Sequence, residues 1–174
     1  MEINKLSFLG TFVSDDSVMG VIMVTDSETK PLEFRVTSTI KPTNFQKILY
    51  GNVLKEHILV ELVAVPLLNA LSEKPDIILV NDPVFLGANA RLDSRVVRIF
   101  SKNDISSVKA TKIDLRSSNS RSDSLNLELP LKFDDELPGI SESLNKISEY
   151  RDLLEPFERL KLACEQIHLK KTKE

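Results

Sequence analysis

The stretch EKPDIILVNDP, Glu73 to Pro83, decides the fold that this chain of 174 residues is expected to adopt. Pro75 ends the helical pattern before it, because proline lacks the N–H that a helix interior requires. DIILVN then forms a continuous apolar run of strand length, which is typical of a parallel strand covered on both faces. Asp82 follows this strand. It is either a catalytic carboxylate or simply the polar residue that ends a strand.

The residues before this stretch change from a strand pattern to a helix pattern. KLSFLGTFVS, VMGVIMVTD and LEFRVT are rich in β-branched and aromatic residues and are separated by the polar turns SDDS and TDSETKP, so they predict a three-stranded antiparallel meander. KPTNFQKILYG predicts a helix that begins after Thr43 and ends at Gly51, where a left-handed cap suits glycine.

The segment Ile58–Val65 suits either a buried strand or a buried helix. The helix formers around it favour a helix, with a break near Pro66 and a second helix to about Glu73. RVVRIFS, after a loop that follows Asp82, predicts the next strand. A strand, a helical crossover and another strand indicate an α/β layer.

Beyond residue 101 the pattern weakens. SVKATKIDLR predicts an edge strand, Ser117 to Ser124 a mobile Ser-rich loop, and LNLELPLKF another strand. The domain prediction is therefore an α/β domain over residues 1–116, the mobile loop over 117–124, and a mainly helical C-terminal extension over 125–174. Within the extension, Pro156 either kinks the last helix or begins a second one.

The last helical segment carries one apolar stripe, at steps of three and four residues. Its members are Tyr150, Leu153, Phe157, Leu160, Cys164 and Ile167. The stripe either docks on the sheet or is presented to a partner helix or a second copy of the chain. Under the second alternative the partner-binding residues are Tyr150, Leu153, Phe157, Leu160 and Ile167.

Composition excludes several classes of function. The net charge is −3, so no global attraction for phosphates is expected and no membrane partner is indicated. Cys164 is the only cysteine, which excludes an intramolecular disulfide and suits a reducing cytoplasm. The sequence has no signal-peptide pattern, no zinc-binding spacing, no dinucleotide or phosphate-binding glycine motif and no Trp. We expect a cytoplasmic protein without a cofactor or a metal site.

With these motifs absent, carboxylates are the remaining candidates for catalytic or metal-binding residues. Asp15, Asp16, Glu61, Asp82 and Asp93 are the residues that could meet at one end of a sheet. A metal-dependent nuclease requires three or four carboxylates that converge on hard cations such as Mg²⁺.

The order of three antiparallel strands, helical segment, parallel strand, helix and strand resembles the ribonuclease H-like fold. PLLNALSEKPDIILVND, residues 66–82, is similar to the endonuclease V-type segment in which a proline-started helix leads into an apolar strand ending in a catalytic Asp. The resemblance implies a catalytic role for Asp82. Glu61 is the candidate second carboxylate if the chain is an enzyme, although it lies five residues before Pro66, further than the Glu of the family pattern. The chain departs from the family pattern, because Pro83 stands where the family has glycine and SFLGTFVS lacks the central Asp of the first strand. The implied site is degenerate.

Arg91, Arg95 and Arg98, together with Lys102 and Lys109, form the local concentration of cationic residues. They are either a solvated face or phosphate contacts.

The leading hypothesis is a non-catalytic interaction or scaffold protein, as a subunit of an intracellular nucleic-acid-handling complex. The first alternative is a nuclease or phosphoesterase that uses Mg²⁺ at Asp82 and Glu61. The second is a small-molecule-binding regulatory domain, which would show a closed apolar pocket.

Overall fold

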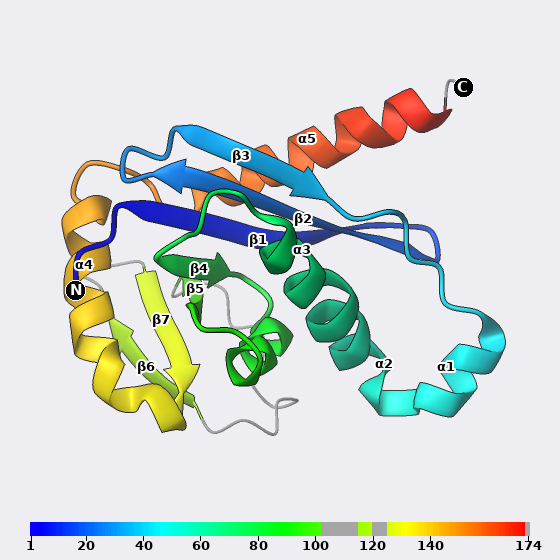
Figure 1. Cartoon of the computed structure of the whole chain (residues 1–174), viewed down its shortest axis with the longest axis horizontal. Helices are drawn as coiled ribbons and strands as arrows, with labels where there is room; N and C mark the ends of the chain where they lie inside the picture. The colour runs from blue at the N-terminus through cyan, green and yellow to red at the C-terminus, as the bar shows by residue number, and fades with distance from the viewer. Residues whose placement is uncertain (102–114, 120–124, 173–174) are drawn as a thin grey trace.

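The computed structural model describes residues 1–101, 115–119 and 125–172. These residues form one seven-stranded sheet with helices on both faces (Figure 1). The strand order across the sheet is β3-β2-β1-β4-β5-β7-β6. The chain is therefore α/β, as its sequence predicts.

The first three strands form the expected antiparallel meander. β1 (Lys5–Ser14) pairs with β2 (Ser17–Asp26), and β2 pairs with β3 (Pro31–Val36). The β1–β2 hairpin closes at the pair formed by Ser14 and Ser17, and Asp15 in its turn adopts a positive φ of 52°, a conformation that Asp tolerates better than most residues.

β4 (Ile77–Val80) lies beside β1 and parallel to it, and β5 (Arg95–Ser101) lies parallel to β4. All four residues of β4 are buried, with Ile77 and Leu79 in the core on one face and Ile78 and Val80 in the core on the other. Full burial explains the continuous apolar run, since neither face can be polar. The strand order and directions from β3 to β5 are those of the ribonuclease H-like fold.

Two further strands extend the sheet. β7 (Leu125–Pro130) pairs antiparallel with β5, and β6 (Leu115–Asn119) pairs antiparallel with β7. The predicted loop over 117–124 is therefore wrong for residues 117–119, which β7 holds in a strand, whereas residues 120–124 lie outside the described part. The predicted edge strand over 107–116 lies outside it except for residues 115 and 116. Because β7 joins the sheet of residues 1–101, residues 125–130 belong to the α/β domain and not to the predicted C-terminal extension. The described residues after them are mainly helical, as predicted.

One face of the sheet is covered by η2 (His57–Ala64), α3 (Val65–Ala70) and η3 (Pro83–Ala90), which packs beside η2. The chain reaches η2 through α1 (Asn44–Tyr50), η1 (Gly51–Val53) and α2 (Leu54–Glu56). The ambiguous segment is helical, as preferred, but the chain does not break at Pro66. η2 is π-helical, with the N–H of Val65 donating to the carbonyl of Val60. This wider turn directly precedes the proline, which would otherwise crowd the turn before it.

The opposite face carries η5 (Leu131–Glu136), α4 (Leu137–Ser148) and α5 (Glu155–Thr172). Pro156 lies in the first turn of α5, where its missing N–H breaks no helical hydrogen bond. Among the helices of the described residues, none is both long enough and apolar enough to cross a membrane.

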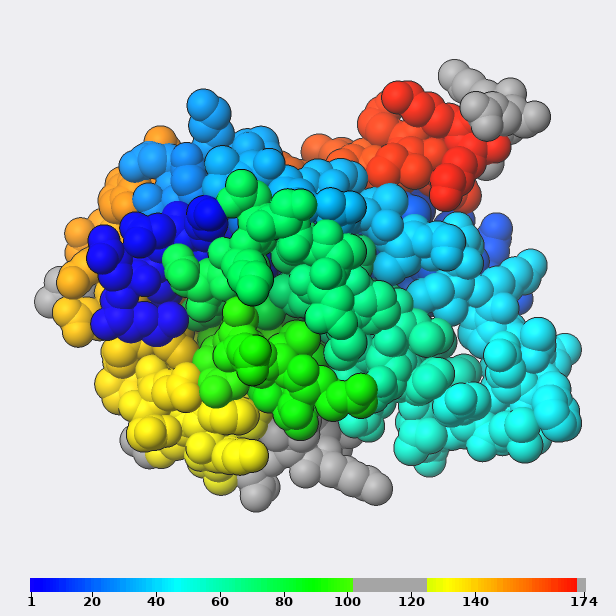
Figure 2. Space-filling view, viewed as in Figure 1, coloured from blue at the N-terminus to red at the C-terminus, as the bar shows by residue number. Residues whose placement is uncertain are grey.

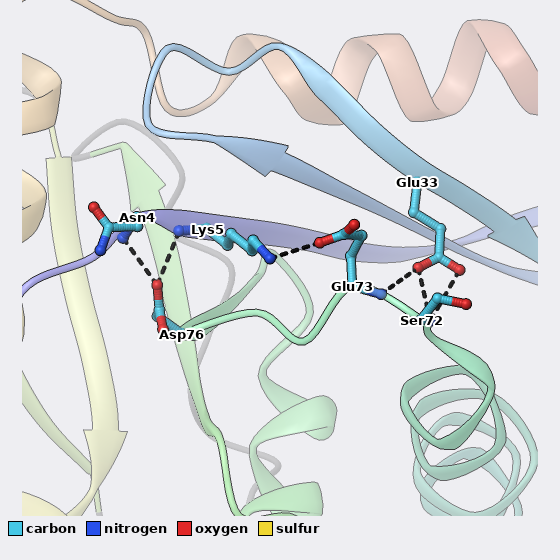
Figure 3. A network of polar contacts seen from close by, with 6 residues as sticks. All are labelled: Asn4, Lys5, Glu33, Ser72, Glu73 and Asp76. Atoms are coloured by element: carbon cyan, nitrogen blue, oxygen red, sulfur yellow. Dashed lines mark hydrogen bonds and ion pairs between the residues drawn. The ribbon is translucent and has the colours of Figure 1, made fainter.

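A polar network positions the start of β4 (Figure 3). The carboxylate of Glu33 on β3 accepts hydrogen bonds from the N–H groups of Ser72 and Glu73, at 2.9 and 2.8 Å. The carboxylate of Asp76 accepts from the N–H groups of Asn4 and Lys5, both at 2.9 Å. The segment before β4 is therefore held against both β3 and β1, which sets the parallel register of β4.

Candidate functional site

A hollow of about 170 Å³ lies where β4 ends beside β1. Val80, the last residue of β4, is paired with Leu9, so Asp82 emerges beside the next residues of β1. α5 closes the other side. The lining residues are Leu9, Gly10, Thr11, Val21, Asn81, Asp82, Phe85, Phe157, Leu160, Lys161 and Cys164. This is the end of the sheet at which the family resemblance implies a catalytic site.

Asp82 makes two contacts that explain its position. Its Oδ2 lies 2.9 Å from Nζ of Lys55, and its Oδ1 accepts a hydrogen bond of 3.0 Å from the N–H of Val84. The second contact caps η3, which begins at Pro83, because an Asp side chain replaces a missing acceptor at a helix N-terminus. Asp82 is therefore both a strand terminus and a helix cap, and its charge is balanced by a lysine.

Glu61 lies elsewhere. Its Oε1 is 2.6 Å from Nη1 of Arg91, and it lines a second hollow that Asp82 does not line. Asp15 and Asp16 lie in the hairpin turn after β1. Within residues 1–101, 115–119 and 125–172, no three His, Cys, Asp or Glu side chains are grouped so that they could hold a metal ion.

The three predicted phosphate-contacting arginines are each paired with a carboxylate. Arg91 pairs with Glu61, and Nε of Arg95 lies 2.9 Å from Oε2 of Glu136. Arg98 is 1% exposed and pairs with Glu128. The prediction is wrong for Arg98, because a buried guanidinium cannot reach a phosphate in solution. Lys102 and Lys109 lie outside the described residues.

The prediction of a single helical stripe is wrong for Tyr150 and Leu153, which lie in the link between α4 and α5, whereas the other members of the stripe lie on α5. Most of the stripe residues nevertheless pack against the sheet. Leu153, Leu160 and Cys164 are buried in its core, and Phe157 and Ile167 pack against that core from its edge. The ring of Phe157 meets that of Phe8 edge-on, with centroids 5.4 Å apart. Docking is therefore the alternative that the structure supports. Leu153 and Leu160 do not face solvent, and Tyr150 is the exposed member of the stripe.

A surface that the sequence analysis did not single out is the α1 arm, residues 44–53. Figure 2 shows this arm, in cyan, as a protrusion at one end of the molecule. α1 contains no buried residue, and its apolar side chains Phe45, Ile48 and Leu49 are 68%, 77% and 65% exposed. Full burial of such a side chain is worth about 1.5–3 kcal/mol, and the fold leaves most of that unrealised here.

The α1 arm is nevertheless well defined in conformation. Thr43 and Gln46 form a reciprocal capping box at its start, and Gly51 ends α1 with a positive φ of 50°. Before the arm, Ile40 exchanges two backbone hydrogen bonds with Val18 on β2. After it, Leu54 packs against the core. The arm is therefore attached to the fold at both ends, at Ile40 and at Leu54, while its apolar side chains face solvent.

The sequence does contain a signal for this surface. Phe45, Ile48 and Leu49 follow the i, i+3, i+4 spacing of one helical face. That spacing alone predicts an apolar face but does not say whether the fold covers it.

Comparison with solved structures finds several similar chains, among them the following two. The endonuclease V of Ciona intestinalis, in complex with DNA, has 13% identity and a TM-score of 0.34, and the match covers 56% of this chain and 45% of that one. The Argonaute of Marinitoga piezophila, in complex with guide RNA, has 10% identity and a TM-score of 0.30, and the match covers 73% of this chain and 22% of that one. This chain thus corresponds to less than half of either protein. No family model matches the sequence, and no curated protein matches it.

Proposed function

We propose that this chain is a non-catalytic interaction domain of ribonuclease H-like topology, and that it binds through the α1 arm. The observation that carries the proposal is the exposure of Phe45, Ile48 and Leu49 on a capped helix that buries nothing. A contiguous apolar surface of this kind on a folded protein marks an interaction site. Because the helix is already ordered, binding would not have to supply its ordering entropy.

The contacts of the implied catalytic carboxylates support the non-catalytic part of the proposal. Asp82 is paired with Lys55, and Glu61 with Arg91. The strand that would supply a further carboxylate contributes Leu9, Gly10 and Thr11 to the hollow, and α5 adds the positively charged Lys161. A lysine in this position opposes the approach of a divalent cation.

The small-molecule alternative has less support. The hollow beside Asp82 has a volume of about 170 Å³, below the range of roughly 300–1,000 Å³ that is usual for ligand pockets. The more specific expectation, a subunit of a nucleic-acid-handling complex, rests on the topology alone and stays a prediction, because one fold serves many functions.

Isothermal titration of Mg²⁺ and Mn²⁺ into the purified protein and into Asp82→Ala tests the non-catalytic part. We expect no saturable heat from either protein. Millimolar or tighter binding that disappears in Asp82→Ala would instead favour the nuclease alternative. Lys55→Ala is the matched variant, since it removes the cation that competes with a metal ion while leaving Asp82 in place.

The stability of arm variants tests the interaction part. Ile48→Ser should change the free energy of unfolding by no more than about 0.5 kcal/mol, as for an exposed surface position, when the protein is dilute enough to exclude self-association. Ile58→Ser, at a position only 6% exposed, should be strongly destabilising in the same urea titration. A large decrease in the free energy of unfolding of Ile48→Ser would mean that the arm contributes to folding rather than to binding.

A further inference from the structure

β3 is the outermost strand at one side of the seven-stranded sheet (Figure 1). β2 pairs with its inner side, and among the described elements β3 packs extensively only against β2. An edge strand carries backbone N–H and C=O groups that its own sheet does not use. The outer side of β3 can therefore pair with a further strand.

The hydrogen bonds to β2 show which backbone groups of β3 the sheet leaves over. The N–H of Thr37 donates to the carbonyl of Gly20 at 2.9 Å, in continuation of the register between the two strands. In an antiparallel ladder, residues whose backbone groups point toward the neighbouring strand alternate with residues whose groups point away. Counting back from Thr37, the groups of Arg35 point toward β2, whereas those of Phe34 and Val36 point outward from the edge.

The side chains of β3 lie on two faces of the sheet, because successive residues of a strand alternate. Val36 packs against the core on the face that α5 covers, and Phe34 lies on that same face but is 40% exposed. Glu33 and Arg35 lie on the other face, with Oε2 of Glu33 and Nε of Arg35 2.6 Å apart. The side chain of Arg35 is 42% exposed, so a second chain can reach it.

The charges of β3 select the register in which a second β3 could pair with it across a two-fold axis. With the axis at Phe34, this residue faces its own copy, and Glu33 of each chain lies opposite Arg35 of the other. With the axis one residue earlier, Glu33 would face Glu33, and with the axis one residue later, Arg35 would face Arg35. Like charges directly opposite one another destabilise a strand pair, whereas opposite charges stabilise it. The register centred on Phe34 also joins outward-pointing backbone groups to outward-pointing groups, as the ladder requires.

We propose that β3 pairs with β3 of a second copy of this chain, antiparallel and with Phe34 on the two-fold axis. The two sheets then form one continuous sheet, in which the Phe34 rings meet on one face and two Glu33–Arg35 pairs form on the other. Copies of a strand that carried a single kind of charge would repel one another, which is how many edge strands avoid pairing. β3 instead carries one acid and one base at equal distances from Phe34, so pairing is favoured in one register. The proposal goes beyond the proposed function, since it uses β3 and not the α1 arm.

Sedimentation equilibrium of the purified full chain, from about 1 µM to about 500 µM, measures this association, which should be weak because β3 contains only six residues. We expect a reversible monomer–dimer equilibrium. Phe34→Pro should weaken it by at least tenfold, because proline removes an outward N–H that the sheet of the monomer does not use. Phe34→Thr keeps this N–H and suits a strand, so it should weaken the dimer less. A chain that stays monomeric over the whole range overturns the proposal, as does a dimer that Phe34→Pro leaves intact.

Arg35→Glu tests the charge pairing. It places two carboxylates opposite one another at both Glu33 positions of the dimer, so self-association should weaken about three- to tenfold. Lys47→Glu makes the same change of charge on the α1 arm and should leave the dimer unchanged. Equal weakening by the two variants would mean that net charge acts rather than the contact of Glu33 with Arg35, and the proposed register would be wrong.

A cysteine at the axis tests the register directly. In the Phe34→Cys dimer the two Cα atoms would lie about 5.5 Å apart, within the range that a disulfide bridges, so mild oxidation should link the copies. Leu32→Cys, at a position of similar exposure, would lie more than about 7 Å from its own copy and should not link. The native Cys164 is buried and does not compete. Faster linking of Leu32→Cys overturns the register, and a dimer that is lost in Ile48→Ser but not in Phe34→Pro would form through the α1 arm instead.

Discussion

Arg98 and Glu128 form an ion pair in the interior of the molecule. Nη1 of Arg98 lies 2.8 Å from Oε2 of Glu128, and the two side chains are 1% and 7% exposed. They are direct cross-strand partners in the β5–β7 ladder. Nε of Arg98 also donates a hydrogen bond of 3.0 Å to the carbonyl of Asn81, and the guanidinium lies over the ring of Phe100. One side chain thus links β5 to β7 and to the end of β4.

Arg98→Met should lower the free energy of unfolding by about 3–5 kcal/mol, because it leaves the Glu128 carboxylate buried without its cation. The double variant Arg98→Met/Glu128→Met should recover most of this loss, since it removes both charges. Urea unfolding measures the difference. Arg91→Met is the matched control, because its ion pair with Glu61 is exposed and should contribute less than about 1 kcal/mol. Equal losses at positions 91 and 98 would contradict the structural role.

Leu160→Ala should destabilise the protein by about 2–5 kcal/mol, the usual range for truncation of a buried leucine. Leu160 is 3% exposed and belongs to the core under α5. Tyr150→Ala, at the exposed end of the same stripe, should have little effect on the thermal midpoint. A small effect at Leu160 would mean that α5 is not docked, and the stripe would again be a candidate for partner binding.

Gly20→Ala should destabilise the protein by about 1–3 kcal/mol through overpacking. A Cβ at Gly20 would lie 2.5 Å from Cγ1 of Val63, where η2 crosses β2. Gly139→Ala is the matched substitution, since a Cβ there meets nothing within 4 Å and alanine is the better helix former. It should be neutral or stabilising by up to about 1 kcal/mol. Thermal unfolding of both variants checks the contrast, which would disappear if β2 and η2 were not in close contact.

Glu33 should make the stability of the protein depend on acidic pH. The backbone N–H of Glu73 holds the pKa of the Glu33 carboxyl below its ordinary value, with smaller contributions from Arg35 and the N–H of Ser72, while desolvation acts in the opposite direction. A folded-state pKa below the unfolded one stabilises the protein above the unfolded value, and the contribution is lost as the pH falls through the folded value.

The measurement is urea unfolding of the wild type and Glu33→Gln between about pH 3 and pH 7, which spans the ordinary Glu pKa. Glu33→Gln should be less stable at pH 7, and the difference should shrink as the pH falls below about 4. A difference that is constant over this range would show that the charge of Glu33 does not contribute. Glu142→Gln is the control, because its ion pair with Lys146 is exposed.

Local patterns predicted most of the strands correctly, because the residues that favour a strand or a turn lie next to one another in the sequence. The meander follows from β-branched runs between polar turns, and β4 follows from an apolar run of four residues that no helix pattern explains. The caps of α1 at Thr43 and Gly51 are visible in the sequence, since each is satisfied by groups within a few residues. The sequence favours a helix at Ile58–Val65, but no local pattern indicates the π-helical turn before Pro66.

The candidate site was predicted less well, because the sequence shows which side chains are charged but does not show which residue each of them pairs with. Arg98 stands in RVVRIFS, whose composition predicts a strand, but Glu128, which neutralises it, is 30 residues further along the chain. Asp82 follows β4, as the sequence predicts, and Glu61 lies within η2. Their pairing with Lys55 and Arg91 depends on how the helices pack against the sheet.

The sequence by itself therefore determined the secondary structure of most segments, since hydrophobic period, caps and turns act over short distances. The tertiary structure alone decided which apolar faces are covered. The α5 stripe and the α1 arm have similar helical patterns, yet Leu160 is 3% exposed and Ile48 is 77% exposed. The physical reason is that burial depends on which distant segment packs against a face, and periodicity reports only that the face is apolar.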